Sequence, residues 1–423
     1  MSAYIFTRLA AHRFVFVWVL SCSAGMLAYA ADGSDWLQWR GSSRDSVASA
    51  NPTWPDRLAD DFFSEQWSVP LGPSYSGPIV LADRVFTTET KDQAQEVVHA
   101  FDRVSGGKLW EASWDGAMSV PFFAAANGSW IRATPACDGS RLFVAGMRDL
   151  LVCLDVESGN ELWRVDFMQR YGTPLPKFGF ASSPMVVDGH VYVQASQSLV
   201  KLDALTGASV WRTAGTDDAM YGSPFSSPLM GTVDGRRQIL LQTRSSLKGI
   251  DPADGAELWS QEIEAFRGMN ILTPTIYGDG VFTSAHSGKS QFWTVSAAAN
   301  QGEAVTEQWT NKAQAYMSSP VIVGDYVYLH LRNQRLSCID LKNGEEQWRT
   351  KPYGKYWSMV AQGDRILALD ERGKLLLFRA NPAEFELLDE RDVAGDSTWA
   401  HLAVCGGQVF VRALDRLTVY RWQ

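Results

Sequence analysis

Aromatic and polar side chains able to hold a ligand or a partner gather in irregular segments of this sequence, between short β-prone runs. Aromatic rings supply apolar contact area, and a few polar groups among them fix the orientation of whatever they bind. The candidates for such a binding site are Tyr75, Trp130, Arg132, Phe180, Tyr221, Asn270, Tyr316, Trp357, Trp399 and His401. A plug of aromatic side chains that only fills space is the alternative, and the residue types leave both open.

Residues typical of catalysis or metal binding lack the spacing that such sites need. The histidines after residue 30 are scattered, at His99, His190, His286, His330 and His401, and show no metal-ligand pattern. The cysteines Cys137, Cys153, Cys338 and Cys405 form no Cys-x-x-Cys pair, which argues against a zinc site and a c-type haem. We therefore predict no catalytic residue and no metal ligand. A disulfide between Cys137 and Cys153 stays open, because repeat alignment places both in one unit.

Five copies of one pattern, Asp-x-x-[Ser/Thr/Asp/Asn]-Gly-x-x-x-Trp, dominate the chain. They run from Asp102 to Trp110, Asp155 to Trp163, Asp203 to Trp211, Asp251 to Trp259 and Asp340 to Trp348. An Asp side chain can accept hydrogen bonds from backbone N–H groups two residues on, and Gly supplies the positive φ of a tight turn. Each copy therefore predicts a hairpin. Repetition of the Trp at one position indicates a structural wedge between units rather than a platform for a flat cofactor.

The repeat also predicts the fold. Each unit opens with a Ser/Thr-Pro or Gly-Pro step, and Pro suits the first residue of a strand because it has no N–H. Successive marker Trp residues lie 39 to 53 positions apart, which is the period of a four-stranded propeller blade. We predict an all-β, eight-bladed propeller of antiparallel four-stranded blades. Residues 399–422 supply only three strands, so the N-terminal strand at residues 65–69 is expected to close the ring.

The Asp…Gly-x-x-x-Trp repeat over residues 65–423 resembles the pyrroloquinoline-quinone (PQQ) propeller repeat. Quinoprotein dehydrogenases and the outer-membrane assembly factor BamB share that repeat. The opening Asp35-Trp36-Leu37-Gln38-Trp39-Arg40-Gly41, followed by Arg44-Asp45, is similar to the head of a bacterial envelope subfamily. The resemblance implies the propeller fold, and it implies PQQ with calcium for the dehydrogenase branch. This chain lacks the adjacent Cys-Cys pair of quinoprotein alcohol dehydrogenases, so we expect no cofactor and keep PQQ with calcium as the alternative.

The connections between units are uneven in length, and function in propellers lies in such variable loops. From marker Trp to the next Pro they measure 11, 25, 21, 17, 15 and 11 residues. One side of one face is therefore built up, and the candidate binding residues lie on these connections.

The first thirty residues read as an export signal. Arg8 and Arg13 precede an apolar run over residues 14–27, and Ala28 and Ala30 suit signal-peptidase cleavage. A lipoprotein box ending at Cys22 remains an alternative, and only that lipid would place the protein on a membrane. We expect a signal peptide at residues 1–30, an N-terminal extension at residues 31–64 and the propeller at residues 65–423. The net charge of −9 argues against a nucleic-acid partner.

The function predicted from these observations is non-catalytic. We expect a periplasmic or cell-envelope scaffold that holds an envelope protein, a peptide segment or a small ligand at the loop-enlarged face. The alternative is a PQQ-dependent dehydrogenase that oxidises alcohols or sugars.

Overall fold

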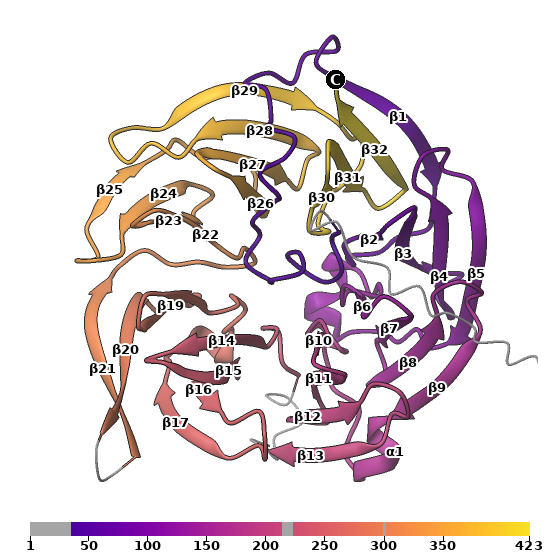
Figure 1. Cartoon of the computed structure of the whole chain (residues 1–423), viewed down its shortest axis with the longest axis horizontal. Coiled ribbons are helices and arrows are strands. Elements are labelled where there is room, and N and C mark those ends of the chain that lie inside the picture. Colours follow the sequence, from indigo (N-terminus) through magenta and orange to yellow (C-terminus); the bar gives the residue numbers. More distant parts are fainter. Residues whose placement is uncertain (1–34, 214–222, 299–301) are drawn as a thin grey trace, which may run out of the picture. The chain divides into compact units, whose positions relative to one another are not determined.

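The computed structural model describes residues 35–213, 223–298 and 302–423. Eight four-stranded antiparallel sheets follow one another around a ring (Figure 1). The fold predicted from the sequence is therefore confirmed.

The first four blades run in chain order from the inner to the outer strand. They comprise β2 (Ile79–Leu81), β3 (Arg84–Lys91), β4 (Gln95–Asp102) and β5 (Lys108–Asp115); β6 (Ala136–Cys137), β7 (Arg141–Gly146), β8 (Leu150–Asp155) and β9 (Glu161–Asp166); β10 (Met185–Val187), β11 (His190–Ala195), β12 (Ser198–Asp203) and β13 (Ser209–Thr213); and β14 (Leu229–Val233), β15 (Arg236–Gln242), β16 (Ser246–Ile250) and β17 (Glu257–Glu262).

The remaining blades repeat this order until the last one. They comprise β18 (Thr275–Tyr277), β19 (Gly280–Ser284), β20 (Ser290–Ala298) and β21 (Gly302–Asn311); β22 (Val321–Val323), β23 (Tyr326–His330), β24 (Leu336–Asp340) and β25 (Glu346–Arg349); β26 (Trp357–Gln362), β27 (Arg365–Asp370), β28 (Lys374–Arg379) and β29 (Glu386–Asp392); and β30 (Ala403–Cys405), β31 (Gln408–Arg412) and β32 (Arg416–Trp422) with β1 (Phe63–Pro70).

The N-terminal strand β1 closes the ring, as the sequence predicts. It pairs antiparallel with β32, from Phe63 opposite Trp422 to Pro70 opposite Arg416. In Figure 1 the indigo β1 accordingly lies beside the yellow C-terminal strands. This pairing covers the outer edge of β32, which would otherwise expose a row of unpaired backbone groups.

Except for Trp259, the repeated Trp residues each donate to a backbone carbonyl of the next blade. Trp110 of β5 donates from Nε1 to the carbonyl of Val156, at 3.0 Å, in the turn that follows β8. The glycine of that turn, Gly159, has φ +72°, and an added Cβ would lie 2.5 Å from the Trp110 ring. Trp163 makes the same pair of contacts with Ala204 and Gly207. The motif thus builds a turn in one blade that receives the Trp of the preceding blade.

The hydrophobic core lies in layers between neighbouring blades. Phe143 and Leu151 of the second blade, for example, pack in one cluster with Val191 and Val193 of the third. Inner and middle strands are buried on both faces, whereas an outer strand such as β9 is largely exposed. The apolar runs of the middle strands therefore reflect burial between two blades.

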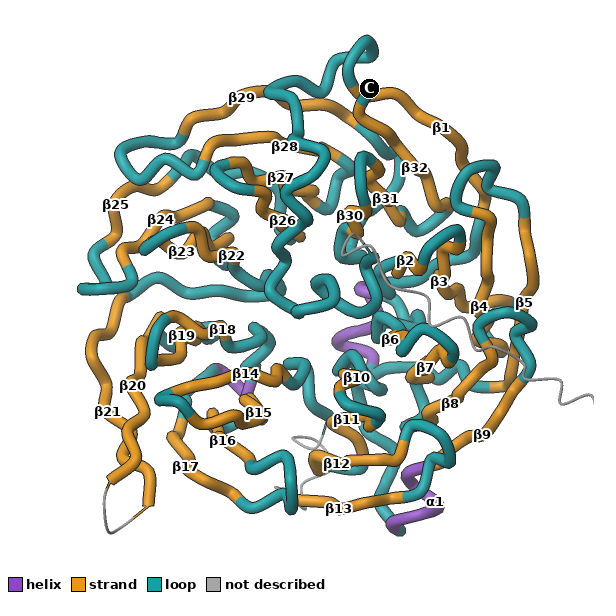
Figure 2. The backbone as a smooth tube through the Cα atoms, in the orientation of Figure 1, coloured by secondary structure: helices purple, strands orange, loops and turns teal. Residues whose placement is uncertain are grey.

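Two faces of the ring carry different loops. The turns between the first and second strands and between the third and fourth strands lie on one face, which we call the turn face. The long connections from each outer strand to the next inner strand lie on the other, which we call the connection face. Figure 2 shows the loops in teal between the strands. The connection face also carries the short helices η1 (Phe122–Asn127), α1 (Phe167–Tyr171) and η2 (Phe266–Gly268). None of the helices in the described residues is long and apolar enough to span a lipid bilayer.

Candidate binding site

Residues 35–48, which we call the head segment, lie against the inner strands at the centre of the ring (Figure 1). Trp36 forms an antiparallel bridge with Val80, and Val47 forms a parallel bridge with Ala361. The carbonyl of Leu37 accepts a hydrogen bond from the backbone of Cys137 at 2.8 Å. Inner strands have one free edge toward the axis, and the head segment occupies that edge in several blades.

Two arginines of the head segment are buried inside the ring. Arg44 donates from Nη1 to the carbonyl of Pro184 at 2.7 Å and from Nη2 to that of Ser183 at 3.2 Å, and Arg40 donates to the carbonyl of Pro320. Burial lowers the pKa of Arg40 to about 10 and that of Arg44 to about 9. Both guanidinium groups lie within 6 Å of the Trp39 ring centroid, at 5.5 and 5.6 Å. The head segment thereby hydrogen-bonds to the proline steps that open the inner strands.

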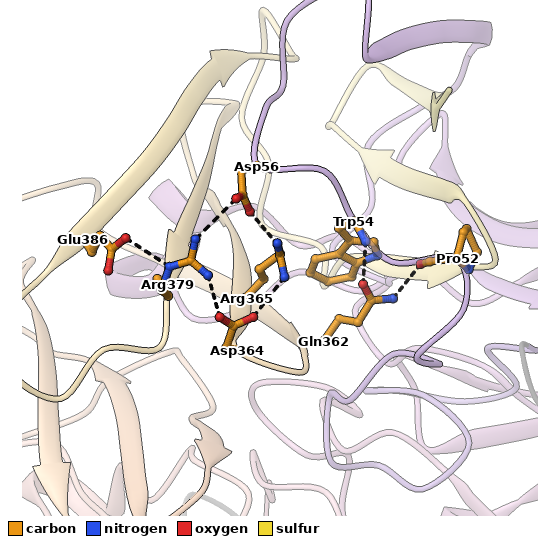
Figure 3. A network of polar contacts seen from close by, with 8 residues as sticks. All are labelled: Pro52, Trp54, Asp56, Gln362, Asp364, Arg365, Arg379 and Glu386. Carbon is orange, nitrogen blue, oxygen red and sulfur yellow. Dashed lines mark hydrogen bonds and ion pairs between the residues drawn. The ribbon is translucent and has the colours of Figure 1, made fainter.

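The segment that links the head to β1 is held against the seventh blade (Figure 3). Gln362 donates to the carbonyl of Pro52 at 2.9 Å and accepts from the backbone of Trp54 at 2.7 Å. Asp56 pairs with Arg365 at 2.6 Å and with Arg379 at 3.3 Å. Trp54 also stacks on Trp422 of β32 at 5.1 Å. This linker is therefore held at several points between the head segment and the strand β1.

From the connection face, two adjoining cavities enter the ring, and together we call them the well. The outer cavity measures about 380 Å³ and the inner one about 150 Å³. Both are lined by Tyr75, Arg132, Ala181, Phe225, Ile271, Met317 and Trp399. The inner cavity also reaches Trp39 of the head segment, so the well has a floor.

Aromatic rings form two arcs along the wall of the well. In one arc Tyr75 stacks on Trp399 at 4.9 Å, and Trp399 contacts Tyr356 at 4.2 Å; Tyr316 follows at 5.8 Å. In the other, Phe178 lies 6.1 Å from Phe123 and 5.5 Å from Phe225. Burial raises the pKa of Tyr75 and raises that of Tyr356 to about 12. The phenols therefore remain protonated donors at neutral pH.

The charged groups of the well are arginines. Arg132 lies 5.9 Å from the Tyr75 ring centroid and Arg244 lies 4.4 Å from that of Phe225, while Arg267 lines the mouth. Desolvation lowers the pKa of Arg132 to about 10. No Asp or Glu is among the described residues that line either cavity. The described lining residues therefore carry only positive charge, although the chain as a whole is acidic.

Exposed phenylalanines surround the mouth. Phe123 of η1 and Phe266 of η2 line the outer cavity and are 53% and 50% exposed. Phe122, also in η1, is 90% exposed and lies 5.6 Å from Phe123. A few large apolar side chains beside an aromatic pocket are typical of a surface that another molecule covers.

The structure brings together part of the predicted set. The predicted residues that do line the well are Tyr75, Arg132, Tyr316, Trp357, Trp399 and His401. Phe180 instead packs on Phe167 at 6.3 Å in the core between the second and third blades. Asn270 is fully buried and donates to the carbonyls of Arg244 and Ile263. Trp130 does not line the described cavities and lies against Gly128. Tyr221 falls outside the described residues.

Several lining residues were not predicted. Trp39 comes from the head segment, and Arg244 comes from the turn between β15 and β16, which the comparison of connection lengths did not consider. Phe178, Phe225 and Tyr356 lie on the connections but were not selected. The sequence predicts their neighbours Phe180 and Trp357 instead. It therefore identifies the right segments but not which side chains of each segment point into the well.

The residues of the well do not fit a calcium-bound PQQ. Calcium takes six to eight oxygen ligands, mainly carboxylates and amide or backbone carbonyls. The described lining of both cavities contains no Asp, Glu, Asn or Gln. Across the described residues, no group of three or more His, Cys, Asp or Glu side chains is placed to hold a metal ion.

Cys137 and Cys153 are buried free thiols, and burial raises the pKa of each to about 12.

Comparison with known proteins places the chain in a family. Residues 93–350, more than half of the chain, match the family model described as outer membrane protein assembly factor BamB. The BamB of Yersinia pestis is 22% identical over 266 residues, which span 58% of this chain and 63% of that protein. The match therefore spans less than two thirds of that relative's length.

Solved structures with the same fold include both branches of the repeat family. The BamB of Moraxella catarrhalis superposes with a TM-score of 0.61 at 16% identity, covering 85% of this chain and 98% of that one. The quinohemoprotein alcohol dehydrogenase of Comamonas testosteroni gives a TM-score of 0.50 at 12% identity, covering 93% of this chain and 81% of that one. These likenesses show the fold, whereas the sequence match is specific. The chain belongs to the family of the outer membrane protein assembly factor BamB.

Proposed function

We propose that this protein is a non-catalytic scaffold of the cell envelope that holds a segment of a partner protein in the well on its connection face. The observation that carries the proposal is the combination of an aromatic well with exposed phenylalanines at its mouth. Its relatives are named as outer membrane protein assembly factors, which supports an envelope location and a protein partner.

The size of the well favours an extended segment over a folded element. An outer volume of about 380 Å³ lies near the lower end of the range for ligand pockets, roughly 300–1,000 Å³. The lining of the inner cavity includes hydroxyl groups just before the inner strands, among them Thr134, Ser183 and Ser319, which suit water or a polar group of the guest. The exposed Phe122, Phe123 and Phe266 would contact the residues on either side of the inserted ones.

Site-specific photo-crosslinking tests this function. A photoreactive residue at Phe122 or Phe266, on the connection face, is compared with one at Leu205, which is 67% exposed in a turn-face loop. We expect one discrete protein to crosslink from both mouth positions in intact envelopes and none from Leu205. Equal crosslinking from all three positions, or none from the mouth, would contradict the proposal.

Export is part of the proposal. The charged start, apolar run and small-residue cleavage site at residues 1–30 support it, and those residues lie outside the described part of the chain. Cleavage after Ala30 gives a free protein, whereas a lipid on Cys22 gives a membrane-anchored one. The intact mass of the exported protein distinguishes the two forms.

A further inference from the structure

Arg132 has no acidic partner in the part of the chain that the structure describes. Its hydrogen bonds are to the carbonyls of Trp130, at 3.3 Å, and Gly128, at 3.4 Å, and both distances exceed the usual range for such bonds. Arg132 is only partly exposed, and a guanidinium partly removed from water without a counter-charge is costly. Such groups are characteristic of sites whose charge is balanced by a ligand.

Arg132 and Arg244 each lie beside an aromatic ring of the well. Arg132 lies beside the Tyr75 ring, and Arg244 lies over Phe225 while it donates to the carbonyls of Ser223 and Arg267. A guanidinium that stacks on a ring can still present its N–H groups at its edge, which is the geometry for bidentate pairing with a carboxylate. Arg132 therefore offers cationic donors next to an aromatic wall.

The described lining residues, which include no Asp or Glu, indicate which guest the well accepts. A guest with a positive charge would lose its hydration, meet the like charges of the arginines and gain no carboxylate partner among the described lining residues. A guest with a carboxylate would pair with Arg132 and relieve the cost of its desolvation. An aromatic side chain adjacent to that carboxylate would fit between Tyr75 and Trp399 on one side and Phe225 on the other.

We propose that the well recognises an extended segment of the partner protein in which an Asp or Glu lies next to an aromatic residue, with the carboxylate held by Arg132. This inference rests on the proposed function and specifies the chemistry of its partner. Aromatic peptides without a carboxylate, and basic aromatic peptides, are the guests that it excludes.

Fluorescence anisotropy with labelled, end-blocked peptides and the full exported chain tests the proposal. The peptides differ at one position of a Glu-Phe pair in a Gly/Ser background: Glu-Phe, Gln-Phe, Lys-Phe and Glu-Ala. We expect the change from Glu to Gln to weaken binding by about tenfold or more, as loss of a charge-assisted pair does. Lys-Phe and Glu-Ala should also bind more weakly than Glu-Phe.

Two further measurements assign the effect to Arg132. In Arg132→Gln the difference between the Glu-Phe and Gln-Phe peptides should disappear, whereas Arg164→Gln, at an exposed outer-strand position paired with Glu161, should keep it. Should Arg132→Gln fail to fold, the salt dependence of the wild-type protein serves instead. Added NaCl should weaken Glu-Phe binding and leave Gln-Phe binding nearly unchanged.

The outcomes distinguish a failure of this inference from a failure of the proposed function. Equal affinity for Glu-Phe and Gln-Phe, preference for Lys-Phe, or no binding of any peptide at about 1 mM would overturn the inference. If crosslinking from Phe122 and Phe266 still yields one partner, the proposed function stands without it. Loss of both results would overturn both.

Discussion

The contact between Trp110 and Gly159 predicts a large difference between two glycine substitutions that look alike in the sequence. Gly159 and Gly189 both have φ +72°, so alanine at either position meets the same unfavourable backbone conformation. A Cβ at Gly159 would lie 2.5 Å from the Trp110 ring, whereas one at Gly189 meets nothing within 4 Å. The pair therefore separates backbone strain from the interlock between blades.

The magnitudes follow from these contacts. Positive φ costs an alanine about 1–2 kcal/mol at both sites. At Gly159 the ring must also move, which adds about 1–3 kcal/mol of overpacking and about 0.5–1.5 kcal/mol for the hydrogen bond from Trp110 to Val156. We expect Gly189→Ala to destabilise the protein by about 1–2 kcal/mol and Gly159→Ala by about 1.5–4.5 kcal/mol more.

Urea unfolding followed by tryptophan fluorescence measures the difference. The midpoint of Gly159→Ala should fall well below that of Gly189→Ala at similar slopes. In a Trp110→Ala background, Gly159→Ala should cost no more than Gly189→Ala does in the wild type, because the clash is gone. Equal midpoints for the two single variants would refute the interlock as a source of stability.

Three further predictions address closure, pH dependence and the cofactor. Deleting Asp56–Leu71 removes β1 and exposes the edge of β32, so we expect a lower melting temperature and self-association in size-exclusion chromatography; an unchanged, monomeric protein would contradict the role of β1. Burial raises the pKa of Asp149 to about 7, so the folded state binds this proton more tightly than the unfolded state, and the contribution of Asp149 to stability falls as pH rises from about 4 to about 7. The variant Asp149→Asn can still accept the hydrogen bond from the backbone N–H of Ser196. Its free energy of unfolding should exceed that of the wild type by an amount that grows over this pH window to about 4 kcal/mol. Parallel pH profiles of the two proteins would count against this. Added PQQ and calcium should give neither a bound-cofactor absorption band nor dye-linked alcohol or sugar oxidation, and either signal would revive the dehydrogenase alternative.

The fold could be predicted from the sequence because its information is local and repeated. Each Asp…Gly-x-x-x-Trp copy specifies a turn and a wedge within a short stretch, and the repetition confirms the register. Closure by the N-terminal strand followed from the missing strand of the last unit. The exception is Trp259 of β17, in the fourth blade, which donates to Gln238 within its own sheet.

The well could be predicted only in part, because its residues depend on contacts that occur once. Connection lengths identified the enlarged face, but an irregular loop has no period to show which way a ring points. Phe180 therefore turned out to be in the core and Phe178 in the well, two residues away. The position of Trp39 at the floor depends on the head segment reaching inner strands far along the chain, which no local pattern encodes.

The central claim, that the mouth of the well holds the partner, is tested most directly by quantitative capture with matched surface variants. The triple variant Phe122→Ser, Phe123→Ser, Phe266→Ser changes exposed connection-face residues, and Val104→Ser, Leu205→Ser changes residues that are 75% and 67% exposed in turn-face loops. Both should fold as the wild type does, because exposed substitutions rarely alter stability by more than about 0.5 kcal/mol. We predict that the triple variant loses at least about tenfold in capture of the crosslinked envelope protein, as loss of aromatic anchors implies, while the turn-face variant captures it like the wild type. Equal capture by the two variants would contradict the claim.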